Sequence, residues 1–152
     1  MLDLNRLLNI SSKDRSEEIK SIVTSEVEKI NSTGTVDGVC KLVANNIKCC
    51  LNDASIKNYT IDLNTTGIDH VSLVAEYYGD ELRRILIDPT ISQFSITETS
   101  YLKNKDLIDK LVKDGLAVID DQSFSEYLSI FSGKTENINL DEYLRNIRIN
   151  KR

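Results

Sequence analysis

Residues 71–87 restrict the fold of this chain more than any other stretch, because apolar side chains recur there at every second position. In "HVSLVAEY", the side chains of Val71, Leu73, Ala75 and Tyr77 fall on one face, which is the period of a β-strand. "YGDE" then predicts a turn, and "LRRILID" predicts a following strand. These residues therefore predict an antiparallel hairpin.

Helical spacing predominates before and after this hairpin. "DRSEEIKSIVTSEVEKIN" carries apolar residues at the helical period, and the two glycines of "STGTVDG" end that helix. A second helix is expected to begin near Val39, and "YTIDL", from Tyr59, predicts another strand. The apolar stripe of this second helix is expected to consist of Val39, Leu42, Val43, Ile47 and Cys50.

The sequence after Pro89 predicts further helices. "NKDLIDKLVKDG", "QSFSEYLSIF" and "LDEYLRNI" have helical periodicity, and Gly115 is expected to close the first of them. "LAVID" predicts a short strand between them. The sum is an α+β fold, in which helices pack against a small antiparallel sheet.

The length of the chain, 152 residues, fits a single domain over residues 1–152 that can bury a core. No internal repeat or low-complexity linker divides it. Within this domain we distinguish an N-terminal helical segment (1–33), a central core (34–94) and a C-terminal, mostly helical segment (95–152).

The net charge of −5 excludes several classes of partner. Sequence-independent binding to nucleic acid needs a basic face, and so does docking on an anionic membrane. No apolar run approaches the ~18 residues of a membrane span, and the charged start "MLDLNRLLNISSKDR" is not typical of a secretory signal. We therefore expect neither nucleic acid nor a membrane as a partner.

The cysteines indicate a reducing compartment such as the cytoplasm. There are three, of which Cys49 and Cys50 are adjacent, and adjacent cysteines rarely bond to each other. One histidine and a Cys-Cys doublet lack the spacing of a zinc site, and no glycine-rich phosphate-binding motif is present. We expect neither a metal nor a cofactor. The acidic pair Asp120 and Asp121 is interpreted as a helix cap rather than as a cation site.

Cys40 is the candidate nucleophile. It stands at the predicted start of the second helix, where unpaired backbone N–H groups and the positive end of the helix dipole favour a thiolate. Gly34 and Gly38 precede it and allow a substrate to approach the backbone closely. In the alternative interpretation Cys40 is a buried small hydrophobe, since free cysteine is among the most buried residue types. Cys49 and Cys50, inside the helix, are interpreted as structural.

His70, the only histidine, and Asp88 occupy the outer ends of the two hairpin strands. If the hairpin reverses around Gly79, the numbers of two residues that face each other across the strands add up to about 158. His70 then lies opposite Asp88. A two-residue slip makes them diagonal neighbours on the same face, still within reach of each other. A one-residue shift would send the carboxylate to the other face. Alone, His70 is interpreted as incidental and Asp88 as a turn-capping residue before proline. Together, Cys40, His70 and Asp88 are the candidate nucleophile, base and orienting carboxylate.

The order of these residues resembles a family. A cysteine on a helix, a histidine opening a strand and "ILIDPTISQF" on the next strand are similar to the papain-like and transglutaminase-like thiol enzymes, most of all to bacterial effector and toxin domains. Residues 34–94 carry this resemblance. It implies a papain-like catalytic core with Cys40 as nucleophile, His70 as base and Asp88 as orienter. The chain departs from the family at Val39 and Val71, where many members have an aromatic residue.

The resemblance also implies an oxyanion hole. Its expected donors are the backbone N–H of Cys40 and one side chain, either Gln93 or Asn31. The alternative interpretation of Gln93 is a surface glutamine in a loop.

Together these patterns lead to the hypothesis of a cysteine-dependent amidohydrolase. The resemblance implies that its substrate is a protein or peptide, that it deamidates glutamine or cleaves peptide bonds, and that it is a bacterial effector or toxin delivered into a target cell. Acyl transfer of the transglutaminase type ranks third. The alternative is a non-catalytic protein-interaction domain of the same fold, which the missing aromatic residues favour, and an intermediate hypothesis makes Cys40 a regulatory redox thiol. The sequence does not specify the oligomeric state.

Overall fold

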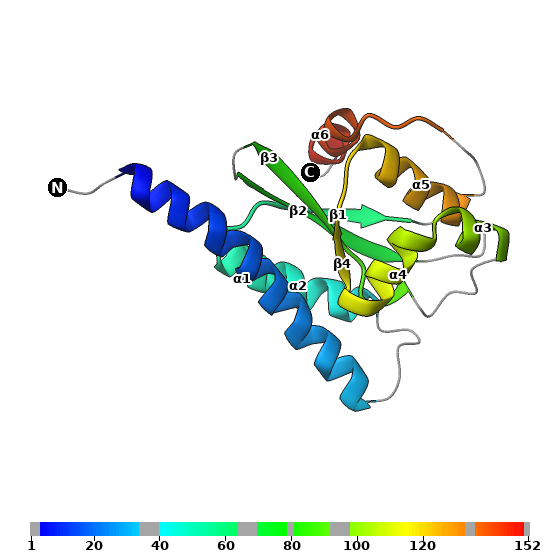
Figure 1. The fold of residues 1–152 in the computed structure, drawn as a ribbon, viewed down its shortest axis with the longest axis horizontal. Helices are drawn as coiled ribbons and strands as arrows, with labels where there is room; N and C mark the ends of the chain where they lie inside the picture. Colours follow the sequence, from blue (N-terminus) through cyan, green and yellow to red (C-terminus); the bar gives the residue numbers. More distant parts are fainter. Residues whose placement is uncertain are drawn as a thin grey trace.

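In the part of the chain that the structure describes, four strands form an antiparallel sheet with helices on both faces (Figure 1). The strand order is β1-β2-β3-β4, so each strand pairs with the next one along the chain. This computed structural model confirms the α+β class, with a small sheet packed against helices. It describes residues 4–33, 40–63, 70–78, 81–91, 98–132 and 136–150.

Most elements lie close to the bounds that the sequence predicts, but α1 begins at Leu4 and not at Asp14, and periodicity did not indicate α3. The strands are β1 (Asn58–Asp62), β2 (Val71–Tyr78), β3 (Leu82–Ile87) and β4 (Leu116–Val118). The helices are α1 (Leu4–Thr33), α2 (Cys40–Asp53), α3 (Glu98–Lys103), α4 (Lys105–Asp114), α5 (Asp121–Ser132) and α6 (Leu140–Asn150). Among these described helices, none is both long enough and apolar enough to cross a membrane.

One face of the sheet packs against α1 and α2. Leu73 and Ala75 of β2 contribute to this cluster together with Ile85 and Ile87 of β3, and Val71 and Tyr77 border it. This confirms the predicted shared face of β2. The helices contribute Ile19, Val23, Val43, Ala44, Ile47 and Leu51.

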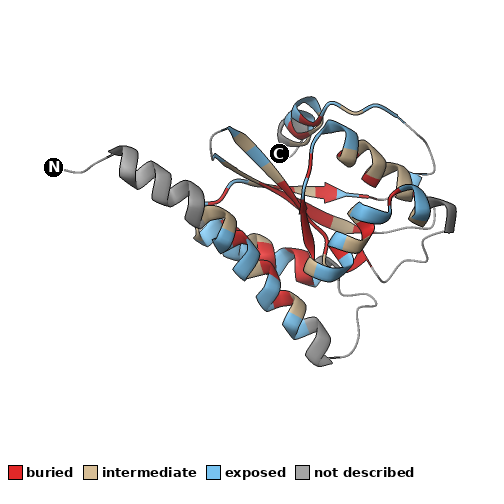
Figure 2. Cartoon of the chain, in the orientation of Figure 1, coloured by how far each residue is buried: buried red, intermediate tan, exposed pale blue. Residues whose placement is uncertain are grey.

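The opposite face is covered by α4, α5 and α6, and it is equally apolar. Val74 and Leu86 of the central strands pack there against Phe124 and Tyr127 of α5. Because both faces are covered, Ser72, Leu73, Val74 and Ala75 are all buried, and the middle of β2 is buried continuously (Figure 2). A sheet with one exposed face would show alternating burial instead.

The buried stripe of α2 differs from the predicted one. Val43 and Ile47 are buried as expected, but Leu42 is 59% exposed and Cys50 is also exposed. The side chain of Val39 lies outside the described residues. Ala44 and Leu51 complete the buried face instead, because the helix presents a different edge to the sheet and to α1.

Gly115 joins the sheet to two helices. It ends α4 with a left-handed φ of 78°, and its N–H donates to Leu111 O at 2.8 Å, as predicted for a helix-closing glycine. Its carbonyl accepts the backbone N–H of Asp88 at 2.9 Å. A Cβ at this position would lie 3.0 Å from Val23 and 3.3 Å from Pro89. Only glycine satisfies both the backbone conformation and the contact with α1.

Replacing Gly115 with alanine should therefore destabilise the protein by about 1–3 kcal/mol, through the strained φ and the contacts with Val23 and Pro89. The urea midpoint of unfolding measures this loss. Val112→Ala is a matched control on the exposed side of α4 and should change stability by less than about 0.5 kcal/mol. Equal midpoints for Gly115→Ala and the wild type would contradict the expectation.

Candidate functional site

His70 and Asp88 meet at one end of the sheet. His70 immediately precedes β2 and Asp88 immediately follows β3. Leu73 pairs with Ile87, so the next position outward places Ser72 opposite Asp88 and leaves His70 diagonal to the carboxylate. This is the register slipped by two residues from the simplest pairing. A shift by an even number of residues does not change the face on which a side chain lies, so the imidazole and the carboxylate share a face.

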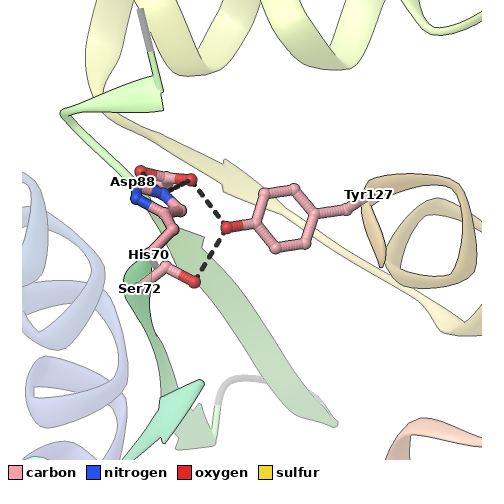
Figure 3. Close-up of polar contacts among 4 residues, drawn as sticks. All are labelled: His70, Ser72, Asp88 and Tyr127. Carbon is pink, nitrogen blue, oxygen red and sulfur yellow. Dashed lines mark hydrogen bonds and ion pairs between the residues drawn. The ribbon is translucent and has the colours of Figure 1, made fainter. Parts of the chain in front are cut away.

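The two side chains are in direct contact. His70 Nε2 lies 2.9 Å from Asp88 Oδ1 and 2.8 Å from Oδ2 (Figure 3). Both residues are 0% exposed. At these distances the carboxylate fixes the orientation of the ring, because an ionised carboxyl group can only accept hydrogen bonds and Nε2 must donate.

Tyr127 of α5 completes a hydrogen-bonded chain with this pair. Its hydroxyl donates to Asp88 Oδ2 at 2.6 Å, and its oxygen lies 2.8 Å from Ser72 Oγ (Figure 3). Burial, followed by the nearby Asp88 carboxylate, raises the pKa of Tyr127 well above its ordinary value near 10. The phenol is therefore held in its protonated form, the form that can donate to Asp88.

Aromatic side chains of α5 enclose the same site. Phe131 stacks on the His70 ring with centroids 5.3 Å apart and an interplanar angle of 20°. Tyr127 meets Phe131 edge-on, with centroids 5.2 Å apart. The imidazole thus lies between the sheet and α5, in an apolar environment in which an unpaired polar atom would be costly.

Sequence reasoning did not assign Ser72, Tyr127 and Phe131 to this site. Tyr127 and Phe131 are both buried in the core. Tyr127 is 39 residues from Asp88, and no local pattern connects the two. The available signal was the position of Ser72, a polar residue on the apolar strand β2, two residues after His70.

Cys40 is the first residue of α2, in agreement with the predicted helix start. Its side chain lies outside the described part of the chain. The first turns of α2 lie at the same end of the sheet as the His70–Asp88 pair, because Val43 and Ala44 line a small cavity together with Pro89 and Thr90. However, α2 packs on one face of the sheet and the imidazole lies on the other.

The remaining predicted positions give a mixed result. Gln93 lies outside the described residues, and so does the side chain of Asn31. Cys49 and Cys50 lie inside α2 as expected but are exposed, so they are not core residues. Asp120 caps α5, since its Oδ1 accepts the N–H of Ser123 at 2.8 Å, which confirms the interpretation as a helix cap.

Metal binding has no support in the described part of the chain, where no cluster of three His, Cys, Asp or Glu side chains is suited to a metal ion. What the described site can do is hold a histidine ring in one orientation through a carboxylate. That is the arrangement by which a base is oriented in nucleophilic catalysis. It is equally an arrangement by which a buried polar group is satisfied in a folded core.

Removing the hydroxyl of Tyr127 should affect stability in a pH-dependent way. At pH 7, Tyr127→Phe should lose about 1–3 kcal/mol, because buried Asp88 loses a donor. Because the pKa of Tyr127 is raised in the folded protein, the protonated phenol stabilises the fold fully at pH values below the pKa of tyrosine in the unfolded chain. This stabilisation is lost as the pH rises above that value. By pH 11, one unit above the unfolded value, the wild type should have lost about 1.4 kcal/mol that Tyr127→Phe does not lose.

Urea unfolding at pH 7 and pH 11 measures the difference in the free energy of unfolding between the wild type and Tyr127→Phe, which should be smaller at pH 11. Tyr78→Phe is the control, because Tyr78 is 70% exposed and its hydroxyl is solvated in both states. If the gap between wild type and Tyr127→Phe were the same at both pH values, the assigned protonation of Tyr127 would be wrong.

No protein-family model, no curated protein and no solved structure matches this chain.

Proposed function

We propose that the protein is a thiol-dependent enzyme acting on a protein amide, with Cys40 as nucleophile, His70 as base and Asp88 as the orienting residue. The observation that carries the proposal is the contact of 2.8 Å between His70 Nε2 and Asp88, made by two residues that lie at adjoining strand ends. The start of α2 at Cys40 supports the choice of nucleophile, since the N-terminus of a helix stabilises negative charge.

The reaction would follow the usual course of thiol catalysis. His70 takes the proton of the Cys40 thiol, and the sulfur adds to the carbonyl carbon of the amide. The C–N bond then breaks, the leaving amine takes the proton from the imidazole, and a thioester remains on Cys40. Water activated by the same ring hydrolyses the thioester and restores the thiol. With a glutamine side chain the leaving group is ammonia, and with a peptide bond it is a new amino terminus.

The burial of the site adds a requirement to this proposal. His70 and Asp88 are both 0% exposed, and Phe131 covers one face of the ring. A substrate can meet the imidazole only when the side chains around it move. The enzyme would then be closed at rest and would open on substrate binding, as many active sites do.

The biological role and the choice among reactions rest on the sequence resemblance alone, since no contact in the fold bears on them. On that basis we propose a bacterial effector or toxin that modifies a protein of a target cell, with deamidation and proteolysis ranked equally and acyl transfer third.

A second function is favoured by one specific observation. The helix that begins at Cys40 packs on the face opposite the imidazole, and both members of the His70–Asp88 pair are fully buried. This arrangement suits a non-catalytic interaction domain, in which the pair and Tyr127 stabilise the packing of α5 on the sheet.

Thiol reactivity distinguishes the two functions. An active Cys40 should be alkylated by iodoacetamide at pH 6.5 at least about tenfold faster than an ordinary exposed thiol. Trypsin separates the thiols, because Cys40 falls in the peptide 30–41 and Cys49 and Cys50 fall in the peptide 49–57. Both of the latter are exposed, so they are reference thiols within the same molecule. His70→Ala and Asp88→Asn should slow labelling of the peptide 30–41.

The peptide 49–57 is an internal reference for the activity of the reagent, since the labelling rate of its exposed thiols should not change in either variant. Equal and slow labelling of both peptides in the wild type would favour the interaction domain. Reversible oxidation of Cys40 without turnover of any substrate would favour a regulatory redox thiol.

If Cys40 is reactive, the intact mass of a candidate target protein identifies the reaction. Conversion of one amide to an acid means deamidation, and a cut chain means proteolysis. Both changes should disappear with Cys40→Ser.

A further inference from the structure

Two adjoining cavities lie along α5, beside the segment 136–139 that precedes α6. A hydrogen bond holds this segment against the helix, since Ser125 Oγ accepts the backbone N–H of Ile138 at 2.8 Å. Ser125, Glu136 and Ile138 line both cavities. We call the two cavities together the α5 groove.

The smaller cavity, of about 210 Å³, is apolar. Its walls include Leu63, Leu128 and Tyr143. They also include Phe131, the ring that stacks on His70 with centroids 5.3 Å apart. The volume is several times the ~30 Å³ share of one water molecule, so it can hold one large apolar side chain. Because Phe131 belongs to both places, this cavity adjoins the imidazole.

The larger cavity, of about 620 Å³, has the volume of an ordinary ligand site and an acidic lining. Among the described residues that line it, Asp121, Glu126 and Glu136 are acidic and Lys103 is basic. No Lys or Arg in the described part of the chain forms an ion pair with any of these three carboxylates. A positively charged ligand therefore complements this cavity.

Glu136 connects the requirements of the two cavities, because it lines both of them. When a basic side chain of a peptide pairs with Glu136, the next residue of that peptide lies only ~3.8 Å away between Cα atoms. An apolar side chain on this next residue is then within reach of the smaller cavity. The ligand that fits both cavities is an extended peptide with these two side chains in succession.

We propose that the α5 groove binds a segment of another protein in which a basic residue lies next to a large apolar one. The basic side chain pairs with Glu126 and Glu136, and the apolar side chain enters the cavity beside Phe131. That this segment belongs to the substrate rests on the proposed function, since Phe131 also covers the imidazole. The docking itself does not rest on it and can be measured without any reaction.

The absence of tryptophan from the chain makes the binding measurement direct. The probe is the acetylated peptide amide Gly-Arg-Trp-Gly-Gly, whose indole is then the only one in the mixture. Its fluorescence should shift to shorter wavelength in a saturable way, because the indole leaves water for an apolar cavity. The same peptide with aspartate in place of arginine should bind at least about tenfold more weakly, because its charge is repelled by the acidic lining.

Three variants of the groove locate the binding. Glu126→Gln and Glu136→Gln should each weaken binding of the arginine peptide about two- to fivefold, as expected for the loss of one partly exposed ion pair. Ser132→Phe adds a ring to a residue that lines the apolar cavity and should abolish the fluorescence shift. Glu17→Gln is the matched control and should leave the affinity unchanged, because Glu17 is exposed on α1, which packs on the opposite face of the sheet.

Equal affinity for the two peptides, or equal weakening by Glu17→Gln and Glu136→Gln, would overturn the proposed docking. Saturable binding of the arginine peptide together with slow labelling of Cys40 by iodoacetamide would uphold the groove and reject the proposed enzyme. Fast labelling of Cys40 without binding of the peptide would do the reverse. If Cys40 is reactive and the groove variants bind less peptide but turn over a target protein at the wild-type rate, the groove is not the substrate site. The two inferences can therefore fail separately.

Discussion

The buried carboxylate of Asp88 is the constraint on which the rest of the structure depends. Removing a carboxylate from water costs several kcal/mol unless its oxygens are satisfied. Here His70 and Tyr127 supply the hydrogen bonds to the side chain, and Gly115 accepts the backbone N–H. These partners come from the start of β2, from α5 and from the end of α4. The carboxylate can be buried with its oxygens satisfied only when the start of β2 and α5 are in place, and the backbone N–H of the same residue joins it to the end of α4.

The register of the β2–β3 hairpin determines whether this network can form. Leu73 pairs with Ile87, which keeps Ser72, His70 and Asp88 on the face of α5. A shift by one residue would turn Asp88 towards the aliphatic side chains of α1 and α2 and would bring Ile87 to the aromatic ones. The apolar alternation on both faces and the polar network therefore require the same register, and each supports the other.

Much of this fold could be predicted from the sequence, because its elements are specified locally. Alternation identified β2, the helical period identified α5 and α6, and Gly115 identified the end of α4. The approach of His70 to Asp88 followed from strand parity alone, and the structure has the second of the two registers that the sequence allowed, the one slipped by two residues. Tyr127 could not be found in this way, because its partner lies 39 residues away and depends on how α5 crosses the sheet. The exposure of Cys50 was missed for a related reason, since the face that α2 presents is set by its contacts with α1 and the sheet.

The position of the candidate site at the end of the sheet has a geometric reason. Within a sheet, the backbone layer separates side chains of opposite faces, so a group on α2 cannot meet an imidazole on the side of α5 there. This barrier ends only beyond the backbone hydrogen bonds that join His70 to Leu63 and Asp88 to Gly115. Cys40 is the first residue of its helix, and His70 and Asp88 lie just outside the strands that they flank. If the thiol and the imidazole act together, they would meet at the strand ends, where side chains from both faces of the sheet can come into contact. The Asp88 carboxylate, held by Tyr127 of α5, would keep the ring in place if the site opened.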